Sequence, residues 1–166
     1  MSEEYKGTTT IGIVCSDGIV LATERRATMG HFIASQEAKK VHQIDTNIGM
    51  TIAGSVGDAQ RLIKWSKMES SSYKLQYGEN ITLKAISNVL ANILNNSKSN
   101  PYSVSLIVGG LDKTGIKLYS LDAIGGLIEE SEFVSTGSGS PFAYSILEDK
   151  YKKNMTTNDG VKLVVR

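Results

Sequence analysis

The sequence has little of what marks disulfide scaffolds and membrane spans. Its 166 residues include one cysteine and two prolines. The single cysteine, Cys15, excludes an internal disulfide and fits a reducing compartment such as the cytoplasm. No stretch approaches the roughly 18 to 20 consecutive apolar residues of a membrane span, and the Met-Ser-Glu-Glu start has no signal-peptide character. The sequence therefore predicts a soluble cytoplasmic protein with no membrane partner.

An excess of charge of one sign is also missing. Lys and Arg total 18 against 17 Asp and Glu, for a formal charge of +1, and no basic cluster is present. This balance argues against a nucleic-acid partner. His31 and His42 together with Cys15 have no metal-ligand spacing, so neither a metal nor a cofactor is expected. A hydrophobic fraction of 40% and 21% charged residues are typical of one globular domain.

Hydrophobic periodicity predicts segregated runs of strands and helices. Strands are expected at residues 8–15, 19–23, 41–44, 49–54, 104–108, 116–121 and 127–135. Two helices are expected between the strand runs, one capped by Asp58 and one over residues 83–94. Two more follow, one from Pro141 with Phe142, Ile146 and Leu147 facing inward, and one from about residue 156 to the last residue. This order favours an α+β fold with helices on the outer faces of antiparallel sheets.

Thr8 follows seven polar residues and begins the first predicted strand. If the Gly7–Thr8 bond were cut, Thr8 would carry a hydroxyl and a free α-amine. An α-amino group has a pKa of about 7.7–8.0, which suits a general base. An N-terminal threonine can therefore supply both the nucleophile and its base. The alternative reading is simple β-propensity at the start of a strand.

Other motifs allow ordinary structural readings. Cys15 lies within an apolar strand and is better read as a small buried hydrophobe than as a nucleophile. The Gly-Ser-Gly-Ser run around Ser138 has the setting of a nucleophile elbow, but without a matching histidine a turn with backbone donors is favoured. By themselves, Glu24 and Lys40 would be surface charges and Gly54 a strand-end glycine.

Five stretches taken together resemble the archaeal proteasome β subunits. They are residues 7–12, 22–30, 39–45, 50–60 and 135–142, in the family's order and near its spacing. The resemblance extends from Gly7 to the end of the chain. It implies an N-terminal-nucleophile hydrolase with a four-layer αββα sandwich and a catalytic threonine freed by self-cleavage.

Site roles follow from this resemblance, position by position. Thr8 is similar to the nucleophile, Gly7–Thr8 to the self-processing bond, and Lys40 to the lysine that favours the deprotonated threonine. Glu24 stands where most relatives carry aspartate and would orient Lys40. Further roles implied are carboxylate support by Arg26, an oxyanion hole at the Gly54 N–H and amine binding by Ser138.

The resemblance also implies a specificity pocket. Its lining would be small and apolar apart from one histidine, and would consist of Ala27, Ala38, His42, Ile52 and Val56. Such a lining leaves room for a large apolar side chain and offers no buried charge to attract Lys or Asp. It predicts a chymotrypsin-like preference.

The organisation implied is a propeptide at residues 1–7 and a β-type peptidase domain at residues 8–166. The family continues past the last predicted helix into further strands, so this domain is expected to be C-terminally incomplete. We expect partners to be other β subunits in a seven-membered ring, α subunits, indirectly a regulatory ATPase particle, and unfolded protein substrates.

Two alternatives to a threonine endopeptidase of the proteasome core remain at this point. The first is a non-catalytic β-type ring subunit, which typically lacks the Gly-Thr junction or the lysine. The second is the peptidase of a bacterial two-component ATP-dependent protease, which forms six-membered rings.

Overall fold

The computed structural model describes residues 8–29, 32–35 and 37–165. For residues 27–29 and 32–35 it describes the backbone only. Its strands are β1 (Thr10–Cys15), β2 (Gly18–Thr23), β3 (Ala27–Met29), β4 (Phe32–Ser35), β5 (Val41–Asp45), β6 (Ile48–Gly54), β7 (Val104–Asp112), β8 (Gly115–Leu121), β9 (Leu127–Glu129) and β10 (Phe133–Thr136). Its helices are α1 (Val56–Tyr77), α2 (Leu83–Asn96), α3 (Ser140–Lys150) and α4 (Thr157–Val164). None of these helices is long and apolar enough to cross a membrane.

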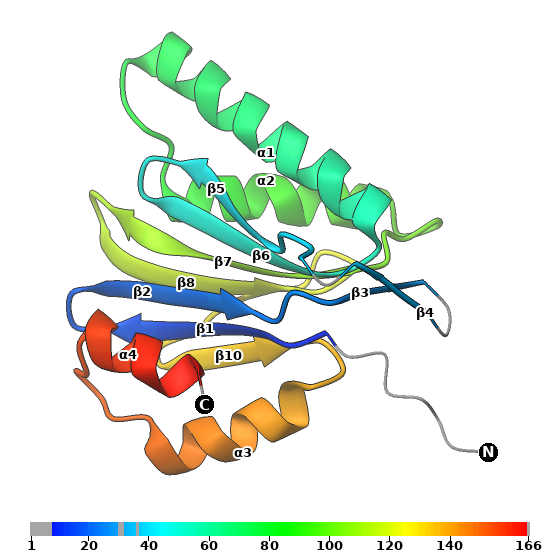
Figure 1. Cartoon of the computed structure of the whole chain (residues 1–166). Helices are drawn as coiled ribbons and strands as arrows, with labels where there is room; N and C mark the ends of the chain where they lie inside the picture. The colour runs from blue at the N-terminus through cyan, green and yellow to red at the C-terminus, as the bar shows by residue number, and fades with distance from the viewer. Residues whose placement is uncertain (1–7, 30–31, 36, 166) are drawn as a thin grey trace.

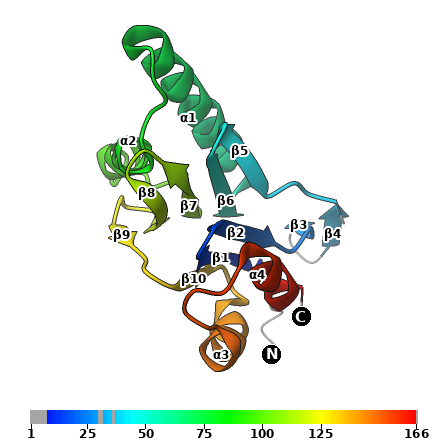
Figure 2. The same cartoon turned by 90° about the vertical axis from the view of Figure 1, so that its left-hand side faces the viewer.

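Two antiparallel sheets form the middle of the molecule, with a helical layer on each outer side (Figure 1). One sheet has the strand order β10-β1-β2 and the other β5-β6-β7-β8-β9. Helices α1 and α2 cover the larger sheet, and α3 and α4 cover the smaller one (Figures 1 and 2). The predicted αββα sandwich is confirmed.

The two sheets approach each other closely because glycine lies where they meet. A Cβ on Gly12 of β1 would lie 2.8 Å from a methyl carbon of Leu118, and one on Gly109 would lie 2.9 Å from Ile19. Ile107, Leu118 and Val134 form the buried core between the sheets. This packing fixes β1, which begins two residues after Thr8, against the larger sheet.

Two local predictions are wrong, and one hairpin was not predicted. Residues 127–135 are two strands, since Glu130 continues the pairing with Leu118 while the Glu132 carbonyl already accepts from Val14. The chain crosses between sheets within this polar step. Helix α1 is capped by Ser55, whose side chain accepts from the Asp58 N–H, so Asp58 lies inside the first turn. The hairpin of β3 and β4 had no sequence signal.

The inward face of α3 also differs from the prediction. Leu147 is buried as expected, but Phe142 is 69% exposed and Ile146 is 42% exposed. Ala143, one turn before Leu147, takes the buried position instead. A small residue there lets the helix lie close to the sheet, and its two larger apolar neighbours point away.

Candidate active site

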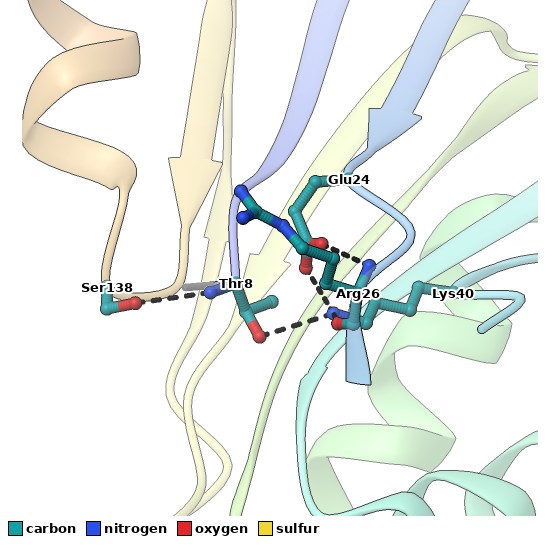
Figure 3. Close-up of polar contacts among 5 residues, drawn as sticks. All are labelled: Thr8, Glu24, Arg26, Lys40 and Ser138. Carbon is teal, nitrogen blue, oxygen red and sulfur yellow. Dashed lines mark hydrogen bonds and ion pairs between the residues drawn. The ribbon is translucent and has the colours of Figure 1, made fainter. Parts of the chain in front are cut away.

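Residues from distant parts of the chain meet at one end of the sandwich (Figure 3). Thr8 lies two residues before β1, Glu24 follows β2, Lys40 precedes β5 and Ser138 lies in the turn between β10 and α3. Antiparallel pairing brings Thr8, Glu24 and Ser138 together, because β1 lies between β2 and β10, and the packing of the larger sheet against this one brings Lys40 to them. The turn is tied to β1 by the Gly139 N–H, which donates to the Thr8 carbonyl over 3.1 Å.

The Lys40 ammonium is the centre of this cluster. It donates to the Glu24 carboxylate, to the Arg26 carbonyl and, over 3.4 Å, to the Thr8 hydroxyl oxygen Oγ1. The Lys40 side chain is only 14% exposed, so solvent screens its charge weakly. A fixed cation therefore faces the Thr8 hydroxyl.

Arg26 supports Glu24 through its backbone. The Arg26 N–H donates to the carboxylate oxygen Oε2, while Lys40 binds Oε1 (Figure 3). Both oxygens of the Glu24 carboxylate thus accept hydrogen bonds, while Arg26 itself is exposed. The contact that holds Glu24 in place does not need the guanidinium.

Ser138 lies next to the Thr8 nitrogen. The Thr8 N–H donates to the Ser138 hydroxyl over 3.2 Å. Gly137 permits this approach: its φ is +90°, and a Cβ there would lie 2.2 Å from the Thr8 carbonyl oxygen. The nitrogen and the hydroxyl of Thr8 therefore have separate partners, Ser138 and Lys40.

Gly54, the last residue of β6, lies across a cavity from Thr8. Gly54, Thr8 and Ser138 line one cavity of about 540 Å³, together with Ala53, Ser55, Ser103, Val104, Ser105, Ala123 and Gly137. Gly54 has a φ of +129°, a conformation that favours glycine. An acyl group bound in this cavity would be within reach of the Thr8 hydroxyl.

Four of the five predicted pocket residues line a second cavity, of about 310 Å³. These are Ala38, His42, Ile52 and Val56, and the fifth, Ala27, has a side chain outside the described part. The cavity also touches Lys39, Lys40 and Gly54, so it borders the Thr8 cluster. Sequence reasoning missed three α1 residues on its wall, Ala59, Gln60 and Ile63. Their spacing from Val56 is that of one helix face, which was the available signal.

His42 is the titratable group of this second cavity. Burial lowers the pKa of His42, and the positive charges of Lys39 and Lys67 lower it further. The hydrogen bond between the His42 ring and the Lys39 carbonyl, 3.0 Å long, acts in the opposite direction and raises the pKa. The His42 imidazole therefore adds no positive charge to the cavity at neutral pH, where the charged lining residues are Lys39 and Lys40. Among the described side chains no three His, Cys, Asp or Glu residues gather as metal ligands, and Gly7 and His31 lie outside the described residues.

A family model described as "Proteasome subunit" matches residues 4–166. The chain belongs to the proteasome subunit family. It is 57% identical over 164 residues to a proteasome subunit beta of Methanococcoides burtonii, covering 99% of this chain and 78% of that protein. Identity is 56% to the proteasome subunit beta of Methanosarcina thermophila, with 97% and 77% covered. It is 54% to that of Ferroglobus placidus, with 98% and 77% covered.

Within the proteasome subunit family, this level of identity groups the chain with the archaeal β subunits. The αββα sandwich is accordingly the N-terminal-nucleophile hydrolase fold that the sequence motifs implied. The bacterial two-component protease is thereby disfavoured as an identity for the chain.

Proposed function

We propose that the chain is a threonine endopeptidase, the catalytic β subunit of a proteasome core, with Thr8 as the nucleophile. The contact between the Lys40 ammonium and the Thr8 hydroxyl oxygen carries the proposal. A non-catalytic subunit has no need of a weakly screened cation held 3.4 Å from a threonine hydroxyl at a cavity. The Gly7–Thr8 bond would be cut first, to free the Thr8 amine.

Peptide cleavage then proceeds by acyl transfer. The free amine of Thr8, positioned by Ser138, takes the hydroxyl proton as Oγ1 attacks the substrate carbonyl. Lys40 stabilises the negative charge on Oγ1, and Glu24 holds Lys40 oriented. The Gly54 N–H donates to the oxyanion of the tetrahedral intermediate. The peptide C–N bond breaks as the amine returns the proton to the leaving nitrogen, and water hydrolyses the Thr8 ester.

Substrate preference is assigned to the cavity of about 310 Å³ beside the site. Apolar lining by Ala38, Ile52 and Val56 and a neutral His42 favour a large apolar side chain before the cleaved bond. We assign the protein to the cytoplasm, with other β subunits in a seven-membered ring and α subunits as partners, a regulatory ATPase acting indirectly, and unfolded proteins as substrates.

The test is substitution of Thr8 in the full-length, assembled protein. Thr8→Ala is expected to retain residues 1–7 by intact mass and to cleave no peptide, whereas Thr8→Ser keeps a hydroxyl and retains processing. Loss of residues 1–7 in Thr8→Ala, with peptide cleavage preserved, would contradict the proposal.

A further inference from the structure

Asp58 joins the start of α1 to the chain just before β7. Its carboxylate oxygen Oδ2 accepts from the Ser103 N–H over 2.9 Å. The Ser103 carbonyl in turn accepts from the Ser55 N–H over 2.7 Å. Residues 55 and 58 therefore hold both backbone polar groups of Ser103, although 45 residues separate Asp58 from Ser103.

Gly54 lies directly against the group that Asp58 holds. An ideal Cβ on Gly54 would be 2.0 Å from the Ser103 carbonyl oxygen and 2.9 Å from the Cα of Val104. Because the Ser103 carbonyl lies where a Cβ of Gly54 would be and also accepts from the Ser55 N–H, we expect a shift of Ser103 to change the position of Gly54. The contact also lies at the candidate active site, because Gly54, Ser55 and Ser103 line the cavity that Thr8 lines.

The direction of the Gly54 N–H follows from the strand register. Gly54 pairs with Val104, and the next pair, Ser55 with Ser103, is hydrogen-bonded. Since hydrogen-bonded pairs alternate in an antiparallel ladder, the Gly54 N–H points away from β7. Two residues earlier, the Ile52 N–H points the same way and donates to the Lys40 carbonyl over 3.1 Å. The Gly54 N–H therefore leaves β6 on the edge where Lys40 lies.

We propose that Asp58 is a positioning residue, which fixes the direction of the Gly54 N–H by holding Ser103 in place. This inference depends on the proposed function, because Gly54 serves there as the oxyanion donor. Asp58 acts through Ser103 and touches neither Thr8 nor the substrate. An oxyanion donor supplies roughly 10²- to 10³-fold in rate, and a displaced donor retains part of this. We expect removal of the Asp58 carboxylate to lower kcat by roughly 10- to 100-fold.

The test compares Asp58→Ala and Asp58→Asn with a matched control, Asp159→Ala, in the assembled protein. Asp159 is likewise an aspartate in the first turn of a helix, α4, behind a threonine N-cap. Its removal costs a similar helix-terminal interaction in the opposite helical layer (Figure 1). The Asn variant keeps an oxygen that can accept from the Ser103 N–H. Asp58→Glu retains the charge but moves the acceptor by one methylene, and it carries the test if Asp58→Ala does not fold.

Two readouts separate positioning from general stability. The first is kcat against KM for a peptide with an apolar residue before the cleaved bond. The second is inhibition by a peptide aldehyde compared with inhibition by the matching peptide alcohol. The Thr8 hydroxyl adds to the aldehyde carbonyl and the adduct places an oxygen at the oxyanion position, whereas the alcohol forms no such adduct. Asp58→Ala, or Asp58→Glu to a smaller extent, is expected to lower kcat and weaken the aldehyde, with KM and the alcohol within threefold of wild type. Asp58→Asn and Asp159→Ala are expected to stay within threefold throughout.

Equal weakening of aldehyde and alcohol would overturn the proposal, and so would an Asn variant as impaired as the Ala variant. Unchanged kinetics in both Asp58→Ala and Asp58→Glu would also overturn it. Failure of the proposed function gives a different result: Thr8→Ala would then cleave the peptide as well as wild type does.

Discussion

Replacing Lys40 with alanine removes the cation next to the Thr8 hydroxyl. The Nζ–Oγ1 distance is 3.4 Å and the Lys40 side chain is 14% exposed. For unit charges at this distance, an effective dielectric constant of about 20 gives an attraction of roughly 5 kcal/mol to an alkoxide on Oγ1. A tenfold change in rate corresponds to about 1.4 kcal/mol. Because Glu24 shares the ammonium, we expect the loss in kcat to be smaller than the full attraction, about 10³-fold.

The assay is steady-state cleavage of a fluorogenic peptide by the full-length, assembled protein. Lys39→Ala is the matched control, because Lys39 is the neighbouring lysine and is exposed, whereas Lys40 is the lysine that donates to the Thr8 hydroxyl. Since Lys39 also borders the substrate cavity, the variants are compared in kcat. We expect Lys39→Ala to stay within threefold of wild type. Lys40→Ala leaves the Glu24 carboxylate without its cation, which could impair folding. The double variant Glu24→Ala/Lys40→Ala removes that carboxylate and controls for this effect. Activity of Lys40→Ala within tenfold of wild type, or equal loss from both lysine variants, would refute the assigned role.

Two further predictions concern Gly54 and His42. Gly54→Ala is expected to abolish peptide cleavage and lower the melting temperature, because the φ of Gly54 is +129° and a Cβ there would lie 2.0 Å from the Ser103 carbonyl oxygen. The control Gly57→Ala should be tolerated, because a Cβ on Gly57 would have no atom within 4 Å. Equal effects of the two substitutions would contradict this prediction. Because burial lowers the pKa of His42 in the folded state, its contribution to stability is present above the unfolded pKa of about 6.5 and is lost as pH falls toward the folded pKa. Thermal melts between pH 5 and 8 should therefore show a steeper loss on acidification for wild type than for His42→Gln, and parallel curves would count against it.

Local patterns in the sequence were enough to predict most of the fold. The helix over residues 83–94 and the strand over residues 116–121 were predicted from hydrophobic periodicity, and both are present. The step at residues 130–132 was missed because a strand that leaves one sheet for another keeps its strand-like composition. The exposure of Phe142 was missed because helical periodicity alone does not say which of two apolar faces meets the sheet.

The site could not be predicted from spacing. Strand pairing across up to 130 residues brings Thr8, Glu24 and Ser138 together, and the packing of the two sheets adds Lys40. Only the family resemblance connected these residues beforehand. Asp58 shows the same limit from another side. Local sequence predicts its carboxylate as a helix cap, while its contact with Ser103 depends on where the first turn of α1 lies relative to the residue before β7.

The identity of the nucleophile is the central claim, and covalent labelling tests it most directly. The assembled protein would be treated with a peptide vinyl sulfone that carries an apolar residue next to the electrophile, and the labelled residue mapped by peptide mass spectrometry. The account predicts one label on Thr8, blocked by a competing peptide substrate and absent from Thr8→Ala. A label on Cys15 or Ser138 that survives in Thr8→Ala would contradict it.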